Sequence, residues 1–489
     1  MSHHLPALIF LLPFLAAICM PMVGLKNPGW CWPMAIAVVF AMSVASIANV
    51  VIVMDSGEIR YAFSGWAPPI GIEWVDDGLA SIIMVTLSLL ALISLIHAGP
   101  TSPSTLGQRI VPYYTLILLL VSGMTGIIFA GDLFNIFVFL EVSALSGYAL
   151  VGVAGGKALM SAFRYLILGT FGASLYLLGV GYFYAATGTL NMADLGQRIP
   201  ELMTSKAVVG GLIFMFIGLG IKMALIPLHG WLPDAYTHAP EAISPFLASL
   251  VTKVALLAWI RIMFWVVGAN AEIEHVPVLF LLEELGALTA VVGAFLALTQ
   301  HEVKRMFAYG GISHIGLILI GVGIGNPTGF AGGVFYLIND AVMQAALFFL
   351  AGAAMYQYGV RSIEDLGRLR GQAPWMTGAL IIMAMSMVGL PPTGGFFGKW
   401  YIVLGALEAQ HYLAVAAVII STILTLAFFI KLFERIFRDS QPSSGIISVE
   451  APFSIKVSVG TASAAIILLG LFSDPIMGFL LESALPPGL

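Results

Sequence analysis

The chain has 489 residues, of which 60% are hydrophobic and only 9% are charged. Soluble domains carry about 25% charged residues, so this composition excludes a soluble protein and predicts one that crosses a membrane repeatedly as helices. The net charge of -5 disfavours a nucleic-acid partner, which requires clustered Lys and Arg. Two cysteines without a CxxC pair disfavour iron–sulfur clusters and structural zinc, so we expect no cofactor and no metal.

Apolar stretches that suit a bilayer span of about 20 residues follow one another along the chain. The first could be a signal peptide, but it lacks a basic start and an obvious cleavage site, which favours a retained span. The pattern predicts an all-α polytopic membrane protein with about 14 transmembrane helices. They lie near residues 5–25, 33–54, 78–98, 111–129, 133–154, 161–187, 207–226, 241–264, 276–299, 306–325, 329–357, 374–407, 411–436 and 455–479.

The basic residues predict the orientation of the chain, because cytoplasmic loops are enriched in Lys and Arg. With both termini on the outer, periplasmic side of a plasma (inner) membrane, most basic residues fall inside and few fall outside. The inner set is Lys26, Arg109, Lys157, Arg164, Lys304, Arg305, Arg361, Arg368, Arg370, Lys431, Arg435, Arg438 and Lys456. The outer set is Arg60, Arg198, Lys206 and Arg261.

Two apolar stretches are interrupted by proline next to a lysine. Lys222 precedes Pro227 in GLGIKMALIPLHGWLP, and Lys399 follows Pro391 and Pro392 in GLPPTGGFFGKW. Proline removes a helical hydrogen bond, and a membrane tolerates such a break only where it is buried or faces water. Paired interruptions therefore predict a transport site.

The spacing of the two breaks predicts an internal repeat within a single membrane domain, 1–489. Five helices in 110–265 and five in 276–437 would each contain one broken helix, and an odd number of helices inverts the second unit relative to the first. Three N-terminal helices (1–100) would precede these repeats, and a C-terminal helix (450–489) would follow them.

Four ionisable residues lie deep in apolar segments: Glu141, Lys222, Lys253 and Lys399. Each costs at least a few kcal/mol at bilayer depth and normally faces a partner or water. Lys222 could snorkel to the surface, and a Glu141–Lys222 pair could merely fasten two helices. The adjacent helix break favours function, and three amines against one clear buried carboxylate predict a path for protons.

Other polar residues could extend this path, because histidine relays protons near neutral pH. The candidates are His229, His238, His314 and Asp340. A lone histidine is more often a hydrogen-bonded structural residue. A second interpretation treats the two histidines after the first break as metal ligands, together with Asp234 and Glu241.

Four motifs resemble the antiporter-like proton-translocating subunits of respiratory complex I, membrane-bound hydrogenases and Mrp-type multisubunit sodium/proton antiporters. They are DLFNIFVFLEV, IKMALIPLHGWLPDAYTHAP, HEVKRMFAYGGISHIG and GLPPTGGFFGKW, and the resemblance covers about 75–435. DLFNIFVFLEVSALSGYAL and the PPTGGFFGKW form are most similar to the D subunit of Mrp antiporters. The resemblance implies that Glu141 and Lys222 form the ion pair of a first half-channel, Lys253 the connecting lysine and Lys399 the terminal lysine.

The resemblance also implies a transporter subunit, not an enzyme, that works with other membrane subunits to move protons, with Na⁺ and K⁺ as candidate exchanged ions. The alternative is a proton-pumping subunit of a complex I-like NADH:quinone oxidoreductase or a membrane-bound hydrogenase; a membrane scaffold whose buried charges have no function is a third hypothesis. One departure from the pattern is Gln344, where many relatives carry a lysine four residues after the position of Asp340. Water or His314 would then carry more of the path between Lys253 and Lys399.

Overall fold

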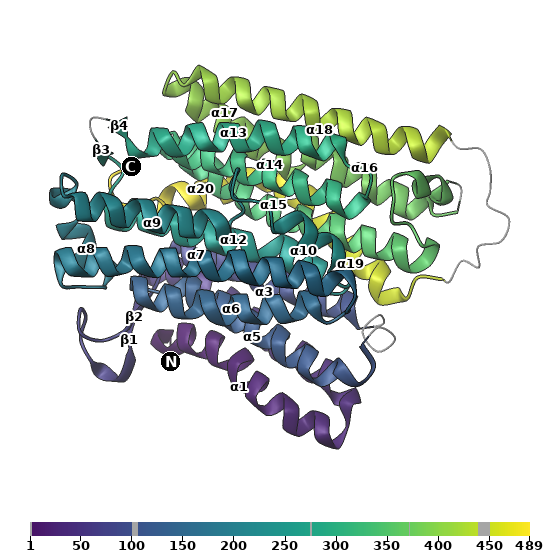
Figure 1. The fold of residues 1–489 in the computed structure, drawn as a ribbon, viewed down its shortest axis with the longest axis horizontal. Coiled ribbons are helices and arrows are strands. Elements are labelled where there is room, and N and C mark those ends of the chain that lie inside the picture. Colours follow the sequence, from purple (N-terminus) through teal and green to yellow (C-terminus); the bar gives the residue numbers. More distant parts are fainter. Residues whose placement is uncertain (1, 100–105, 274–275, 371, 439–449) are drawn as a thin grey trace.

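Long helices lie side by side in the computed structural model, which describes residues 2–99, 106–273, 276–370, 372–438 and 450–489 (Figure 1). Among these residues, 12 helical segments are long and apolar enough to cross a membrane. Two interrupted helices bring the number of crossings to 12 + 2 = 14. The prediction of an all-α polytopic membrane protein with about 14 spans is confirmed.

The N-terminal helices are α1 (Leu5–Lys26), α2 (Cys31–Ser56) and α3 (Gly78–Ala98). The next group is α5 (Ile110–Phe129), α6 (Leu133–Gly152), α7 (Lys157–Thr187), the interrupted pair α9 (Lys206–Lys222) and α10 (Leu232–His238), α11 (Ser244–Phe246) and α12 (Thr252–Arg261). Two π-helical turns, η6 (Leu247–Val251) and η7 (Ile262–Val267), flank α12.

A second group repeats this arrangement. It consists of α13 (Val278–Thr299), α14 (Val303–Gly323), α15 (Pro327–Tyr358), the interrupted pair α16 (Pro374–Val388) and α17 (Gly394–Glu408), and α18 (Tyr412–Arg438). The C-terminal helices are α19 (Phe453–Leu471) and α20 (Ser473–Ser483). In both groups the fourth helix is the interrupted one, as the sequence predicts; the boundaries of the two repeats stay a prediction.

Short elements connect the long helices. They are α8 (Met192–Arg198), an antiparallel hairpin of β1 (Ile59–Ala62) with β2 (Glu73–Asp76), and a smaller one of β3 (Glu272–Ile273) with β4 (Val276–Pro277). Single 3₁₀ turns cover Ser2–His4, Pro28–Trp30, Phe63–Gly65, Gly107–Arg109, Pro200–Leu202 and Glu364–Leu369.

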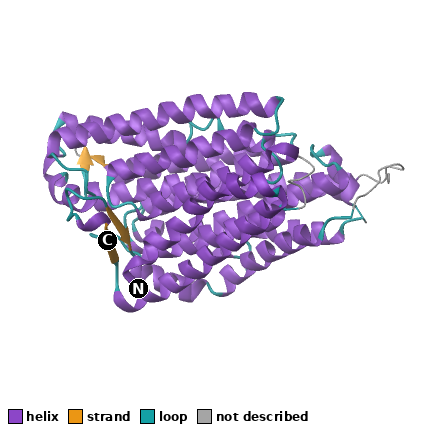
Figure 2. Cartoon of the chain, turned by 90° about the horizontal axis from the view of Figure 1, so that it is seen from below, coloured by secondary structure: helices purple, strands orange, loops and turns teal. Residues whose placement is uncertain are grey.

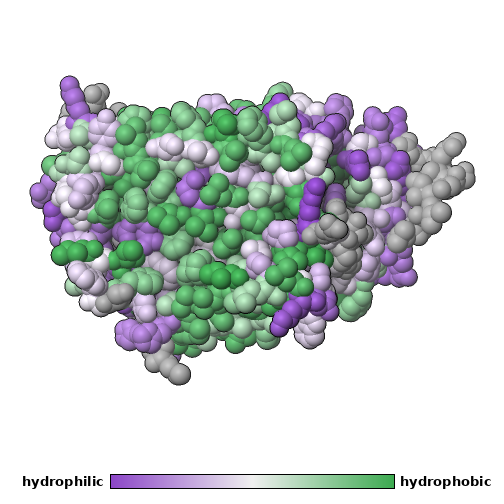
Figure 3. All heavy atoms as spheres, turned by 60° about the horizontal axis from the view of Figure 1, so that its bottom comes forward, coloured by the Kyte–Doolittle hydropathy of each residue, from purple (hydrophilic) through white to green (hydrophobic). Residues whose placement is uncertain are grey.

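The two ends of the bundle differ in what they carry. Both termini and both hairpins lie at one end, which we call the terminal end (Figures 1 and 2). The opposite end, which we call the basic end, carries the starts of α5, α7 and α14 with their arginines and lysines. Apolar side chains dominate the surface between the two ends (Figure 3). Which end faces the periplasm stays a prediction.

Glycines allow α13 to pack closely against α14, and α15 against α17. A Cβ on Gly316 of α14 would lie 2.3 Å from the backbone nitrogen of Ala290 on α13, and one on Gly398 of α17 would lie 2.7 Å from the Tyr336 ring on α15. The most buried apolar stretch of α15 has all its residues buried within the chain. Asn339, Asp340 and Gln344 of α15, each at most 1% exposed, are therefore held away from lipid and solvent.

Both predicted helix breaks are present, and the freed carbonyls have new partners. At the first break, the Trp231 indole donates a hydrogen bond to Ile221 O at 2.6 Å. At the second, Gly389 is left-handed at φ +87°, and the carbonyls of Met387 and Val388 accept hydrogen bonds from the Lys399 ammonium. Carbonyls at both breaks thus have hydrogen-bond partners, as membrane insertion requires. Pro227 at the first break and Leu390, Pro391 and Pro392 at the second are exposed in the isolated chain.

Candidate functional site

Glu141 on α6 and Lys222 at the last turn of α9 face each other. Their Oε1 and Nζ atoms are 3.7 Å apart, and the Lys222 ammonium donates a hydrogen bond to the Tyr148 hydroxyl at 3.1 Å. Lys222 is only 6% exposed, so it does not snorkel to the surface. The Glu141 side chain is 25% exposed in the isolated chain, so one side of this pair is open at the flank of the bundle.

The second charged group is fully enclosed between α12, α14 and α15. Lys253 Nζ lies 2.8 Å from Asp340 Oδ2, and His314 Nδ1 lies 2.8 Å from Asp340 Oδ1. The ammonium also donates to Ala248 O at 2.7 Å, in the π-helical turn η6. The expectation of a single clear buried carboxylate was wrong, because Asp340 is 0% exposed and is the direct counter-charge of Lys253.

The hydrogen-bond partners of Lys399 on α17 are uncharged groups. Its ammonium donates to Met387 O at 3.0 Å, Val388 O at 3.2 Å and the Thr422 hydroxyl at 3.0 Å. Within the described residues it forms no ion pair with a carboxylate, in contrast to Lys222 and Lys253. Its charge is offset by carbonyl dipoles that the break in the helix leaves free.

Polar groups continue from Asp340 toward α16 and α17. The Ser386 hydroxyl on α16 donates to Asn339 Oδ1 at 3.4 Å, and the His314 ring meets the Tyr336 ring edge-on at 5.3 Å. In the described part of the chain, several buried atoms of this region have no hydrogen-bond partner: His314 Nε2, Tyr336 Oη, Asn339 Nδ2 and Gln344 Nε2. Such groups normally bond to internal water, which suits a hydrated path past Gln344.

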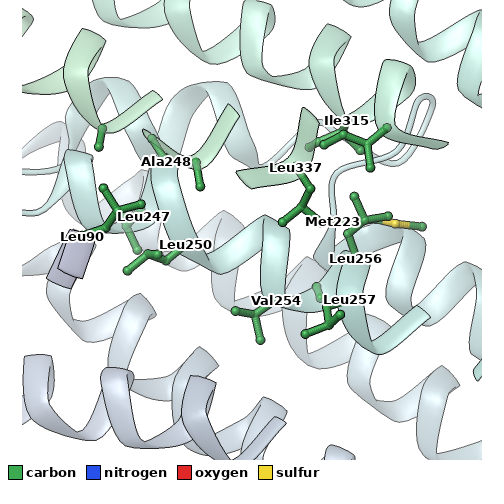
Figure 4. Close-up of a cluster of buried hydrophobic side chains, with 14 of the residues drawn as sticks. Leu90, Met223, Leu247, Ala248, Leu250, Val254, Leu256, Leu257, Ile315 and Leu337 are labelled. Carbon is green, nitrogen blue, oxygen red and sulfur yellow. The ribbon is translucent and has the colours of Figure 1, made fainter. Parts of the chain in front are cut away.

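Buried apolar residues directly follow Lys222, Lys253 and His314 in the chain. Met223 follows Lys222 in the chain, Val254 follows Lys253, and Ile315 follows His314, and all three belong to one buried cluster (Figure 4). A setting of this kind has a low dielectric constant, so each charge interacts strongly with its few neighbours. The other labelled members are Leu90, Leu247, Ala248, Leu250, Leu256, Leu257 and Leu337.

The two histidines after the first break lie apart from the charged groups. His238 Nδ1 is 2.9 Å from the Ser161 hydroxyl and lines a cavity of about 470 Å³ at the basic end. The ring of His229 lies 5.9 Å from that of Tyr309. No hydrogen bond or ion pair among the described residues joins either histidine to Glu141 or to the three buried lysines, so their part in proton transfer stays a prediction.

The metal interpretation of this region does not fit the contacts. Asp234 pairs with Arg164 at 2.7 Å and with Arg305 at 2.8 Å, and Glu241 pairs with Lys304 at 3.5 Å. Both carboxylates therefore form ion pairs with arginine or lysine side chains of the same chain. No group of three or more His, Cys, Asp or Glu residues that could hold a metal ion is found within the described ranges.

Fourteen crossings, two interrupted helices and buried acid–base groups beside the interruptions define a multi-pass membrane protein of the ion-translocating class. Comparison with known families makes this more specific. The chain belongs to the family described as NADH:quinone oxidoreductase/Mrp antiporter, transmembrane, which matches residues 130–425. This range contains Glu141, the three buried lysines, His314 and Asp340.

Individual proteins named for both kinds of complex are similar to this chain over nearly its whole length. The chain is 39% identical to the N subunit of NADH-quinone oxidoreductase from Desulforudis audaxviator, over 99% of both chains. It is 31% identical to the D subunit of the Na(+)/H(+) antiporter from Alkalihalophilus pseudofirmus, over 91% of this chain and 90% of the relative. A chain in the structure of the Mrp complex from Dietzia is 25% identical, with a TM-score of 0.87, over 98% of this chain and 96% of that one.

Proposed function

We propose that this chain is the proton-translocating subunit of a multisubunit Na⁺/H⁺ antiporter in the plasma membrane, with both termini outside. The proposal is supported by three separate charged groups inside the helix bundle, Glu141–Lys222, Lys253–Asp340–His314 and Lys399. We propose that protons pass along them in this order, and we call the three groups the row of charges. The 31% identity to an antiporter D subunit over most of both chains supports this host complex.

The mechanism rests on making and breaking ion pairs. At 3.7 Å and an effective dielectric of 20, Glu141 and Lys222 attract each other by about 4 kcal/mol. Closing the pair holds the Lys222 ammonium charged, and opening it releases a proton to move along the row. The Asp340 carboxylate provides a second such switch for Lys253, and Lys399 ends the row.

The experiment is proton and sodium exchange in inverted vesicles from cells that express the whole set of partner subunits. We expect Glu141→Ala and Lys222→Ala to abolish exchange, because each removes one half of the first pair. Lys206→Ala is the matched control, since Lys206 is exposed at the other end of the same helix. Full exchange by either of the first two variants contradicts the proposed path.

A redox-driven complex is the second candidate host. It is favoured by the 39% identity to an NADH-quinone oxidoreductase N subunit over 99% of both chains. The buried charges would serve proton pumping there by the same pairwise switching. Purification of the tagged full chain in mild detergent separates the two hosts: small membrane subunits alone indicate an antiporter, whereas iron–sulfur and quinone-reactive partners indicate the redox complex.

A further inference from the structure

A buried acidic cluster lies at the terminal end, away from the row of charges described above. Asp76 ends β2 and is 0% exposed, and its carboxylate accepts hydrogen bonds from the Asn49 amide of α2 and from the Ser81 hydroxyl of α3 at 2.6 Å. The next residue, Asp77, caps α3 and receives two hydrogen bonds at 2.7 Å from Arg261 of α12. Three helices and a hairpin thus meet around two adjacent carboxylates.

The charges of this cluster do not balance. Arg261 is 3% exposed and its ion pair is with Asp77; among the described residues Asp76 has no ion pair of its own. On β1, Ile59 stands opposite Asp76, and the charged Arg60 pairs with Glu58 and Glu73 instead. With both carboxylates ionised the cluster carries one net negative charge in a buried setting, and a single proton neutralises it.

A second feature of the cluster also points to a ligand. Asn49 is 0% exposed, and its Oδ1 atom has no hydrogen-bond partner within the described chain, although its amide nitrogen is bonded to Asp76. The Arg261 Nε atom is likewise without a partner there. The Asn49 oxygen is an acceptor that water or a protonated neighbour can satisfy, whereas the Arg261 Nε–H is a donor that water can satisfy. The surroundings of Asp76 therefore suit a proton and its hydration.

We propose that Asp76, held by Asn49 and Ser81 beside the Asp77–Arg261 pair, is a proton-binding site that links the terminal end to the middle of the bundle. Arg261 follows Lys253 by eight residues on one helix, which at 1.5 Å per residue is about 12 Å. The site therefore lies on the terminal side of the Lys253–Asp340 pair. Its use in transport rests on the proposed function, whereas its binding of a proton does not.

Electrostatics agrees with this assignment. Burial raises the pKa of Asp76 to about 6, and the neighbouring Asp77 carboxylate also raises it. The hydrogen bonds from Ser81 and Asn49 and the charge of Arg261 lower this pKa and offset part of the effect of burial. Asp76 thus gains or loses its proton in a pH range that occurs in cells and in their surroundings.

Infrared difference spectroscopy of the purified complex with the full chain, titrated from alkaline to acidic pH, tests the binding of the proton. We expect a protonated-carboxyl band with a midpoint near pH 6 that Asp76→Asn loses. Glu58→Gln, which alters an exposed carboxyl at the same end, keeps the band. A band that persists unchanged in Asp76→Asn overturns the proposal.

Ser81→Ala keeps the test decisive if Asp76→Asn does not fold. Removing one hydrogen bond to the charged carboxylate should move the midpoint upward by about one pH unit; an unmoved midpoint contradicts the site. In vesicles with the pH varied only on the terminal side, Asp76→Asn should flatten the pH dependence of transport near pH 6. An unaltered pH profile overturns the link between Asp76 and transport. Full transport by Lys222→Ala refutes the proposed function instead; the infrared band of Asp76 then still decides whether this carboxyl binds a proton.

Discussion

Asp340 is the carboxylate on which the middle of the charged row depends, and Asp340→Asn tests that dependence. Its two oxygens contact Lys253 Nζ and His314 Nδ1, each at 2.8 Å. Asparagine has nearly the same shape but no negative charge. The variant has one acceptor oxygen in place of two and leaves the buried Lys253 ammonium, which also donates to the Ala248 carbonyl, without a counter-charge, so we expect proton transport to be lost.

The expected magnitude follows from the geometry. Opposite unit charges 2.8 Å apart attract each other by about 6 kcal/mol at an effective dielectric of 20. Removing one partner of a buried pair typically costs about 3–5 kcal/mol, because the other charge stays buried without compensation. If about 4 kcal/mol of this cost is added to the activation free energy of a proton-transfer step, the rate of that step falls about 1,000-fold, since each factor of ten corresponds to about 1.36 kcal/mol.

The assay is the initial rate of proton uptake into vesicles, measured with a pH-sensitive dye and corrected for the amount of folded protein. Asp340→Glu keeps the charge and should retain part of the rate. The double variant Lys253→Met, Asp340→Leu replaces both charged side chains by apolar ones of similar volume, a change that is often neutral or stabilising for a buried pair. We expect it to unfold at the wild-type temperature or above, without transport. Transport by the double variant would refute the reasoning, because the pair would then only fasten α12 to α15.

Three further predictions concern packing, pH and orientation. Gly316→Ala should lower the free energy of unfolding by about 1–3 kcal/mol through overpacking, measured by thermal unfolding, while Gly210→Ala, with nothing within 4 Å of its Cβ, should not. Because the Asp76 pKa rises from 3.8 to about 6 on folding, the folded state binds this proton more tightly. Stability from this group is therefore present at acidic pH and falls by about 3 kcal/mol as the pH rises through that interval. Asp76→Asn should remove that part of the pH dependence of the melting temperature, and an unchanged profile would contradict it. In a background without the two native cysteines, Glu58→Cys should react with an impermeant maleimide in intact cells and Glu434→Cys only after permeabilisation; the reverse pattern would invert the orientation.

The spans and breaks could be predicted because their signals are local in the sequence. A run of apolar residues specifies a span by itself, and a proline beside a buried lysine specifies an interruption. The Lys253–Asp340 pair had no such signal, because its members are 340 - 253 = 87 residues apart and lie on helices of different groups. The sequence predicts Asp340 as a proton-relay candidate, but its role as the counter-charge of Lys253 follows only from the packing of α12 against α15.

The acidic cluster at the terminal end cannot be predicted from the sequence for a different reason. The sequence WVDDGLAS has the form of an ordinary helix start, for which one aspartate is sufficient as a cap. The structure uses Asp77 for the cap and turns Asp76 inward. The signal was the second aspartate, since two adjacent carboxylates at a helix start need a cation or a proton if both become buried.

Each lysine of the row contacts or occupies a place where the regular helical backbone is interrupted or ends. Lys253 is bonded to a carbonyl in a π-helical turn, Lys399 to two carbonyls at the break between α16 and α17, and Lys222 ends α9, where the helix dipole favours a positive charge. A regular helix uses its carbonyls internally and offers none at these depths. An ammonium in the apolar core needs such acceptors. The irregular backbone, together with the carboxylates, therefore decides where along the row a proton can be held.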